Sequence, residues 1–317
     1  MTGYLVRRLG QAVVVLWAAW TVAWLVLWAL PGDAVEVRLG IEANGVTPEQ
    51  ADALRASMGL DQPWPVQYLT GLGRALTGDL GTSWENGRPV TALLAAGLQA
   101  TLALTALALL LAVVFGAGIA LLSTGTRYRR LNRALLNLPP LGVAVPGFWL
   151  GLILLEVFSF RLSLFPAIGN EGFASLVLPA VTLAVPTSAL IAQLLSRSLQ
   201  DALDQPWADT ARAKGARPSR VLLGHALRNA ALPALTITGL IVGQLLSGAV
   251  VAETVFSRTG LGRLTASAVT AQDTPVVQGI VLFAALVFVV VNLAVDLLYP
   301  LLDRRIVPRA AAKASRP

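Results

Sequence analysis

The sequence predicts an all-α, multi-pass membrane protein with six transmembrane helices and both termini in the cytoplasm. Three observations lead to this fold class. Hydrophobic residues make up 56% of the 317-residue chain and charged residues only 13%, whereas a soluble domain carries about 25% charged residues. Apolar runs without charges recur along the chain at the length that a bilayer requires. The basic residues gather in alternate connecting loops.

Six apolar runs are long enough to cross a membrane. A helix needs roughly 20 residues to span about 30 Å of hydrocarbon, and the runs cover residues 9–30, 98–123, 135–158, 176–195, 230–251 and 276–298. The first run exceeds the roughly 7–15-residue apolar core of a secretory signal, and it ends in a poor cleavage site, Trp28-Ala29-Leu30-Pro31. We therefore expect it to be retained as a transmembrane helix.

The Lys and Arg residues orient these spans. Of the 24 basic residues, 17 lie before the first span, after the second, between the fourth and fifth, or after the sixth. Because connecting loops rich in Lys and Arg stay in the cytoplasm, both termini are predicted to be cytoplasmic. The net charge of +7 is then mostly a topology signal, and a nucleic-acid partner is not expected.

The composition excludes several kinds of chemistry. The chain has no Cys, so disulfides, zinc–thiolate sites and thiol nucleophiles cannot form. His225 is the single histidine and cannot build a multi-histidine metal site. The sequence contains no GxxxxGK[ST] string that could cradle a nucleotide phosphate. Any energy for transport must therefore come from an ion gradient or from another subunit.

Residues 31–97 form a long connection that the orientation places outside the cell membrane. Its string TPEQ at residues 47–50 is typical of a helix start, with Thr47 as N-cap and Gln50 closing a capping box. This helix should run to about Met58. Apolar residues at near-helical spacing favour a small structured element over a mobile loop: Leu60, Trp64, Tyr68, Leu72, Leu76 and Leu80.

The loop at residues 197–229 is longer than a simple connection requires. Pro206 suits the first turn of a helix over residues 207–214, and Gly215 is a natural stop in the left-handed conformation. Pro218 then starts a second helix. One face of this second helix is predicted to be apolar (Leu222, Leu223, Ala226, Leu227 and Ala230) and the opposite face basic (Arg217, Arg220, Gly224 and Arg228).

Two functions fit this helix–glycine–helix elbow. It could be an amphipathic hairpin whose arginines lie on anionic lipid headgroups. It could instead be a rigid element that docks into the groove of a partner protein. Small side chains on the first helix favour docking, because they permit close helix approach, whereas a helix facing lipid would carry Leu or Phe: Ala208, Thr210, Ala211 and Ala213.

The string DTARAKG at residues 209–215 resembles the EAA loop of binding-protein-dependent ABC importer permeases. The surrounding string WADTARAKGARPSRVLLGHALRNAALP resembles the dipeptide/oligopeptide/nickel branch of that family. Further strings match this branch in one collinear order over nearly the whole chain: Arg7-Arg8 with Leu30-Pro31-Gly32-Asp33, Gly59-Leu60-Asp61-Gln62-Pro63, Gly78-Asp79-Leu80-Gly81, Glu253-Thr254-Val255-Phe256, Gly260-Leu261-Gly262, Pro275-Val276-Val277-Gln278-Gly279 and Asp296-Leu297-Leu298-Tyr299.

The resemblance implies that the elbow is a coupling helix seated in a groove of an ATPase subunit. Asp209 and Thr210 depart from the family's Glu and Ala but remain acidic and small, and Ala211 and Gly215 keep the pattern. The implied coupling residues are Asp209, Thr210, Ala211, Arg212, Ala213, Lys214 and Gly215.

The resemblance also implies the remaining organisation of the transporter. Residues 1–97 would carry an N-terminal helix and the extracytoplasmic segment, 98–303 a five-helix type I importer core, and 304–317 a cytoplasmic tail.

The chain would be no enzyme and would hold no cofactor, with ATP and Mg bound at two partner ATPase subunits. A second, homologous permease would complete a heterodimer in the cytoplasmic (inner) membrane, and an extracytoplasmic binding protein would deliver substrate. Di- or oligopeptides are the first expected substrates, with nickel chelates, haem or oligosaccharides as alternatives.

Four further residues are candidates for function. Gln244 and Ser247 in the fifth span could line the translocation pathway, although hydrogen bonding between helices is the alternative. Glu253 and Arg258, just after that span, could contact a docked binding protein, or they could be ordinary solvated charges. Prolines in the third and fifth spans are expected to distort those helices: Pro139, Pro140, Pro146 and Pro233.

The rival class is a gradient-driven secondary transporter or channel. It would predict coupling carboxylates near the middle of the membrane and an inverted internal repeat. The predicted spans hold almost no charge at mid-membrane, and the sequence shows no such repeat. A membrane-embedded enzyme is disfavoured because paired carboxylates, a second His and a Cys are all missing.

Overall fold

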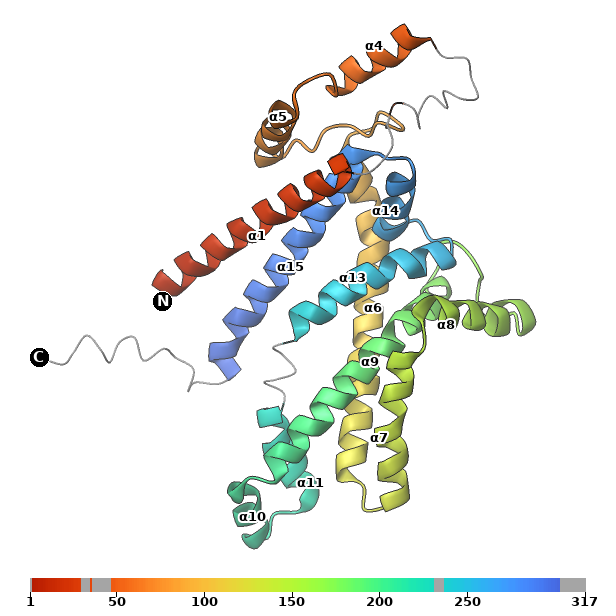
Figure 1. Ribbon diagram of the computed structural model, residues 1–317. Coiled ribbons are helices and arrows are strands. Elements are labelled where there is room, and N and C mark those ends of the chain that lie inside the picture. Colours follow the sequence, from red (N-terminus) through yellow and green to blue (C-terminus); the bar gives the residue numbers. More distant parts are fainter. Residues whose placement is uncertain (1, 30–34, 36–46, 231–236, 303–317) are drawn as a thin grey trace, which may run out of the picture. The chain divides into compact units, whose positions relative to one another are not determined.

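A computed structural model describes residues 2–29, 35, 47–230 and 237–302 of the chain (Figure 1). Within these ranges every regular element is a helix, and an isolated β-bridge joins Thr82 to Pro89. The predicted all-α fold class is therefore confirmed.

The helices of the described ranges follow one another in this order: α1 (Thr2–Ala29), α4 (Pro48–Met58), α5 (Trp64–Leu76), α6 (Val90–Gly125), α7 (Arg129–Ala144), α8 (Gly147–Leu154), the π-helix η1 (Leu155–Arg161), α9 (Ala174–Leu203), α10 (Pro206–Ala213), α11 (Pro218–Arg220), the π-helix η2 (Val221–Ala226), α13 (Thr238–Val255), α14 (Leu261–Thr270) and α15 (Thr274–Leu302).

Four helices of the described part are long and apolar enough to cross a membrane without a break. Their apolar segments correspond to the predicted first, second, fourth and sixth spans: Val6–Ala29, Val90–Gly125, Ala174–Leu203 and Thr274–Val295. The predicted fifth span is described only in part, because residues 231–236, with Pro233, lie outside the described ranges. The described part of this span contains the shorter apolar helix Leu240–Val255. The count of six spans and the side on which each terminus lies stay predictions.

The predicted third span, residues 135–158, is a bent pair of helices. α7 and the segment of α8 and η1 meet at an angle of 100°. The break falls at Val145, whose backbone is extended, and at Pro146, which follows it. A proline disfavours helical dihedrals at the preceding residue and cannot donate a backbone hydrogen bond, which accounts for the break before Pro146. Pro139 and Pro140, for which distortion is also predicted, lie inside α7.

The capping box before α4 is present as predicted. The backbone N–H of Gln50 donates to Thr47 Oγ1 at 3.4 Å, and the backbone N–H of Thr47 donates to Gln50 Oε1 at 3.2 Å. The helix ends at Gly59, which has a left-handed φ of 70°. A second helix, α5, follows over part of the apolar face expected between Leu60 and Leu80. The segment after α1 is therefore structured over 47–89.

The described chain forms two compact units, each assembled from three stretches of sequence. The first contains Met1–Thr105, Leu155–Pro179 and Leu246–Val287, and the second contains Ala106–Leu154, Ala180–Leu245 and Phe288–Pro317. The predicted division at residues 97/98 and 303/304 stays a prediction, and the tail 304–317 lies outside the described residues. The buried core of the first unit joins α6, α14 and α15 through Val90, Leu93, Leu94, Leu261, Ala268, Val276, Val277 and Ile280.

The carboxylate of Glu253 is a polar junction inside the first unit. Glu253 is 1% exposed, and its Oε1 accepts a hydrogen bond from Thr101 Oγ1 of α6 at 2.6 Å. Its Oε2 accepts from the backbone N–H groups of Gly262 at 2.8 Å and Arg263 at 3.1 Å. These N–H groups belong to the first turn of α14 and lack partners in their own helix. Glu253 therefore caps α14 and ties it to α6.

Asp273 forms a similar junction at the turn between α14 and α15. It is 2% exposed and accepts hydrogen bonds from the hydroxyl of Ser83 and from the backbone N–H groups of Trp84 and Glu85. All three donors lie in the loop that leads into α6. A carboxylate with three hydrogen-bond donors holds its position firmly, so this loop is fixed against the start of α15.

Substituting Gly262 by Ala should destabilise the first unit. A Cβ at this position would lie 2.6 Å from Val250 Cα and 2.7 Å from Val250 N, both of which are backbone atoms. The crowding should lower the free energy of unfolding by about 1–3 kcal/mol, measured as a lower thermal unfolding midpoint of the purified protein in detergent.

Gly73→Ala in α5 is the matched control, because a Cβ at Gly73 meets nothing within 4 Å. Ala is a better helix former than Gly by about 1 kcal/mol, so this variant should unfold at the wild-type midpoint or above it. Equal midpoints for Gly262→Ala and Gly73→Ala would contradict the close packing of α14 on α13.

Candidate functional site

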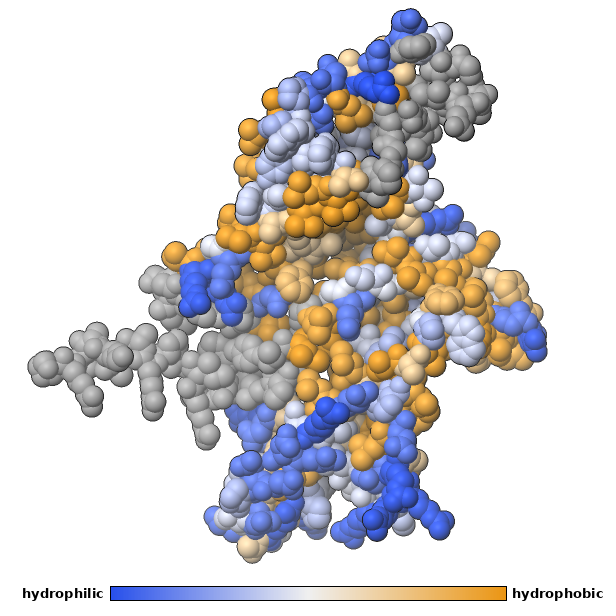
Figure 2. Space-filling model, in the orientation of Figure 1, coloured by the Kyte–Doolittle hydropathy of each residue, from blue (hydrophilic) through white to orange (hydrophobic). Residues whose placement is uncertain are grey.

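The predicted elbow is present in the second unit. α10 begins at Pro206 and ends at Ala213, close to the predicted bounds, and Pro218 opens the second half of the elbow. Pro206 lies in the first turn, where its missing N–H has no helical partner to lose. Figure 2 shows mainly hydrophilic residues over α10 and the first turn of α7.

The end of α10 is a Schellman motif. The backbone N–H of Gly215 donates to Arg212 O at 2.9 Å, and the N–H of Ala216 donates to Ala211 O at 3.1 Å. Gly215 has a φ of 82°, which a residue with a Cβ adopts only at a cost. The predicted stop at Gly215 is therefore present, and it sets the direction in which the chain leaves α10.

The seven predicted coupling residues lie together on the elbow. All of them are exposed except Ala211, which is half-buried, whereas Ala208 is completely buried and anchors the opposite side of α10. Asp209 Oδ1 accepts a hydrogen bond from Arg212 Nη1 at 2.7 Å, and the Asp209 side chain is 80% exposed. The outer side of α10 is therefore a charged, small-residue surface that nothing in the second unit covers.

The second half of the elbow differs in one respect from the prediction. Leu222, Ala226 and Ala230 are buried as expected, but Leu223 is 54% exposed and Val221 is buried in its place. The reason is the π-helical turn η2, Val221–Ala226, whose wider turn shifts which side chains face inward. The basic face is confirmed, since Arg217, Arg220, Gly224 and Arg228 are all exposed.

Two contacts that the sequence did not reveal hold the elbow together. The rings of Trp207 in α10 and His225 in η2 meet edge to face, with centroids 6.2 Å apart. Trp207 also packs against a buried cluster formed by α6, α9 and the second half of the elbow: Ala120, Leu195, Leu199, Ala202, Leu222, Ala226 and Ala230. The elbow is thus a rigid body fixed to the ends of two long helices.

Gln244 and Ser247, the candidate pathway residues, are both exposed on α13. They are three residues apart and so share one face of the helix. That face is open to solvent, lipid or another subunit in the described structure. The assignment of these two side chains to a pathway stays a prediction.

Glu253 and Arg258, expected to contact a binding protein, are instead buried. Arg258 is 3% exposed, and its Nη1 donates to Gly169 O, Ser175 O and Ser175 Oγ at 2.8–3.0 Å. Burial lowers the pKa of Arg258, although neighbouring Glu253 opposes the shift. Both side chains are bonded within the protein, and their direct contact with a binding protein stays a prediction. Charge alone in the sequence could not distinguish a solvated residue from a bonded one.

A cluster of aromatic rings joins α1 to α5 in the first unit. Trp24 stacks on Trp28 with centroids 6.2 Å apart, and it meets Tyr68 edge to face at 5.4 Å. Trp64 lies 6.2 Å from Trp24 and 6.4 Å from Trp28. The spacing of Trp20, Trp24 and Trp28 at every fourth position could have signalled this cluster from the sequence.

The described residues contain no group of three or more His, Cys, Asp or Glu side chains that could hold a metal ion. Long apolar helices joined to a rigid, charged elbow define the class of protein: a helical membrane protein with an exposed element suited to docking.

Comparison with known proteins gives the particular family. The family described as "Binding-protein-dependent transport system inner membrane component" matches residues 112–308, and the family of its N-terminal part matches residues 1–105. The chain belongs to this family and is an inner-membrane permease component of a binding-protein-dependent ABC importer, as the sequence resemblance indicated.

Two relatives support this assignment, and one solved structure shares the fold. The chain is 37% identical over 299 residues to the glutathione transport system permease protein GsiC of Pectobacterium atrosepticum, covering 94% of this chain and 97% of the relative. It is 35% identical to a putative peptide transport system permease protein of Brucella abortus, covering 96% and 99%. A chain of the inward-facing MetNI methionine ABC transporter shares the fold, with a TM-score of 0.55, 19% identity and coverage of 68% and 98%.

Substituting Trp207 by Ala should loosen the elbow without unfolding the protein. The change removes the edge-to-face contact with His225 and part of the apolar packing on α9. The free energy of opening at the end of α10 should fall by about 1–3 kcal/mol, measured as faster hydrogen exchange of the Gly215 and Ala216 amides.

His225→Phe is the control for this measurement, because an aromatic ring at position 225 preserves an edge-to-face pair. It should leave the exchange of the same amides near the wild-type rate. Wild-type exchange in Trp207→Ala would show that the ring contact does not hold the elbow.

Proposed function

We propose that this permease forms the translocation pathway of an ATP-driven importer of short peptides. The similarity to relatives named for glutathione and peptide transport supports this substrate class, since glutathione is itself a tripeptide. The similarity extends over nearly the full length of both the chain and these relatives. The observation that carries the coupling role is the rigid elbow, whose outer side is exposed and ends at the left-handed Gly215.

The elbow is suited to transmit a motion from an ATPase subunit. Its small and charged residues, Asp209 to Lys214, would lie in a groove of the partner, and Ala208 fixes the inner side of α10 to the permease. The Schellman motif keeps the angle between the two halves of the elbow constant. A displacement of α10 would therefore pass to the second half of the elbow and, through it, to the helix that follows. ATP binding by the partner would thereby shift the permease between two states.

The energy source lies in other subunits in this proposal. The sequence offers no phosphate-cradling loop, so two partner ATPase subunits would bind ATP and Mg and carry out hydrolysis. A second, homologous permease would form a heterodimer with this chain. Gln244 and Ser247 would then face the pathway between the two permeases, since their side of α13 is open here.

An extracytoplasmic binding protein would deliver the peptide and supply most of the selectivity. Glu253 and Arg258 would serve this contact indirectly, because their buried hydrogen bonds position the segment between α13 and α14. Thr259 of that segment and Arg263 in the first turn of α14 are exposed, and these two residues would touch the binding protein.

Substituting Gly215 by Val should uncouple ATP hydrolysis from uptake. A β-branched residue is strained at a φ of 82°, so the chain would leave α10 in a different direction. Peptide uptake into proteoliposomes that contain the whole transporter should fall at least about tenfold, a change of ~1.4 kcal/mol in coupling, while the binding protein still binds peptide.

Gly224→Ala tests whether the effect is specific to the turn. Gly224 is exposed on the same elbow but has a helical backbone, and an added Cβ would lie 3.9 Å from its nearest neighbour, Arg220 Cγ. This variant should retain coupled uptake. Undiminished ATP-driven uptake by Gly215→Val would refute the coupling role of the elbow.

Affinity purification of the chain from its native membrane should recover an ATPase, a second permease and, on addition, a binding protein loaded with peptide. Mass spectrometry of the subunits and of the bound ligand would provide the readout. An active homo-oligomer that transports along an ion gradient without ATP would support the secondary-transporter class instead. A bound nickel chelate, haem or oligosaccharide would leave the importer assignment intact and change its substrate.

A further inference from the structure

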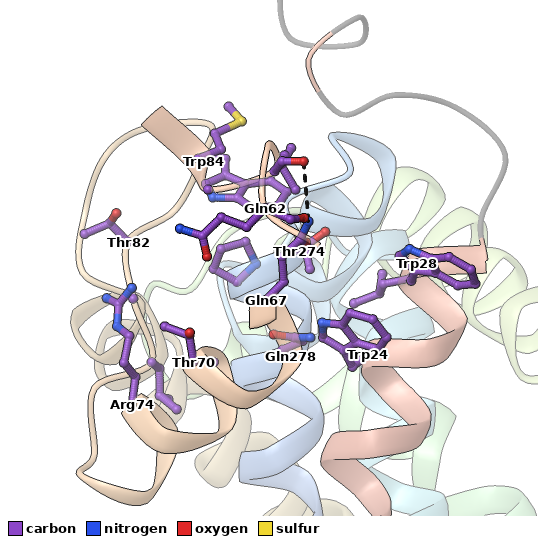
Figure 3. Close-up of a pocket in the computed structure, with 18 of the residues that line it drawn as sticks. Trp24, Trp28, Gln62, Gln67, Thr70, Arg74, Thr82, Trp84, Thr274 and Gln278 are labelled. Atoms are coloured by element: carbon purple, nitrogen blue, oxygen red, sulfur yellow. Dashed lines mark hydrogen bonds between the residues drawn. The ribbon is translucent and has the colours of Figure 1, made fainter. Parts of the chain in front are cut away.

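A cavity of about 700 Å³ lies within the first unit, on the segment that follows α1. Its walls come from the ends of α1 and α4, from α5 with the loops on either side of it, and from the end of α14 and the start of α15; Figure 3 labels residues of α1, α5, the loops and α15. Its volume falls within the range of about 300–1,000 Å³ that is typical of small-molecule sites. Neither the elbow nor α13 contributes to it, so the cavity is separate from the candidate coupling and pathway residues.

Two side chains that line the cavity carry buried hydrogen-bond donors without a partner among the described residues. Trp20 is 5% exposed and its Nε1 makes no hydrogen bond, and Gln278 is 8% exposed and its Nε2 makes none. Buried donors are almost always paired in folded proteins. Since both side chains line the same cavity, a bound molecule with hydrogen-bond acceptors would satisfy them.

The charged groups of the cavity are already neutralised. Arg74 Nε donates to Asp79 Oδ2 at 2.8 Å, and Arg55 Nη1 donates to Asp52 Oδ1 at 3.0 Å. The hydrogen bond from Arg74 is the main cause of a lowered pKa at Asp79, with the backbone N–H of Gly81 adding to it. The remaining polar lining consists of amides and hydroxyls, including the glutamines Gln62, Gln67, Gln272 and Gln278. A ligand that is neutral within the cavity is therefore favoured.

The walls of the cavity are held in place before any ligand binds. The Asp273 junction fixes the loop of Trp84 against the start of α15, and the aromatic cluster fixes α5 against α1. Gln272, which lines the cavity, has a φ of 51°, a strained conformation for a residue with a side chain. Strained backbone of this kind gathers at ligand sites, where the surrounding structure maintains it.

We propose that this cavity is a second peptide site, on the permease itself, which binds a short peptide through its backbone. The carbonyl oxygens of the peptide would accept hydrogen bonds from Trp20 Nε1 and Gln278 Nε2, and the glutamine amides would pair with its other backbone groups. An apolar side chain of the peptide would lie against Trp24 and Leu27. The choice of a peptide rests on the proposed function, whereas the existence of the site rests on the cavity.

A peptide fits the lining better than a sugar does. Trp20 and Trp24 are 5% and 7% exposed and lie within the wall, whereas Trp28, at 60% exposed, could stack on a sugar or on a peptide group alike. Amide side chains offer a donor and an acceptor side by side, as a peptide group does. No charged side chain among the described lining residues is unpaired. The cavity therefore favours the uncharged interior of a peptide over its charged termini.

The test measures binding of tritiated acetyl-Ala-Leu-Ala-amide, a peptide without charged ends, to the whole transporter in nanodiscs without its binding protein. Equilibrium dialysis should show saturable binding. Gln278→Leu removes one unpaired donor at nearly constant volume, and Trp20→Phe removes the other while keeping an aromatic ring, so each should weaken binding about tenfold. Trp17→Phe is the matched control, because Trp17 is 53% exposed on α1 and does not line the cavity; it should bind as wild type does.

Thermal unfolding midpoints equal to that of the wild type would establish that the variants are folded. Absence of saturable binding to the wild type, wild-type affinity in both donor variants, or displacement of the peptide by maltotriose would each overturn the proposal. Uptake into proteoliposomes is a separate measurement. Peptide binding without ATP-driven uptake would contradict the proposed function but support the site. ATP-driven uptake without peptide binding to the cavity would contradict the site but support the proposed function.

Discussion

A peptide group in hydrocarbon has no water with which to form hydrogen bonds, so each N–H and C=O must find its partner within the protein. Helices meet this requirement along their length but leave unpaired groups at both ends. In this chain several short helices outside the long apolar ones also have a specific partner at such an end. Thr47 and Gln50 cap α4, Glu253 caps α14, and the left-handed Gly215 closes α10. The positions of these partners fix where α4 and α14 begin, where α10 ends, and how the chain runs at each of these points.

Features that depend on local spacing could be predicted from the sequence. The capping box of α4, the stop at Gly215 and the break before Pro146 each follow from a few neighbouring residues whose backbone preferences are strong. The family followed from short strings in a fixed order. Most of the elbow could therefore be predicted from the sequence.

Features that depend on contacts between distant segments could not be predicted. Glu253 and Arg258 carry charges that suggest a solvated loop, yet Thr101 and Ser175, far away in sequence, bring them inside. Leu223 is exposed because η2 departs from the helical period on which the prediction relied. The cavity required three separate segments to meet, and no single stretch of the chain indicates it.

The Schellman motif at the elbow has a consequence for how such a subunit could be adapted to a new motor. Backbone bonds and one glycine dihedral set the angle of the turn, so the identities of the exposed side chains between Asp209 and Lys214 hardly affect it. These side chains could be exchanged to match the groove of a different ATPase while the geometry of force transmission stays the same. The side chains that would bind the ATPase are thus different atoms from the backbone groups that fix the angle of the turn.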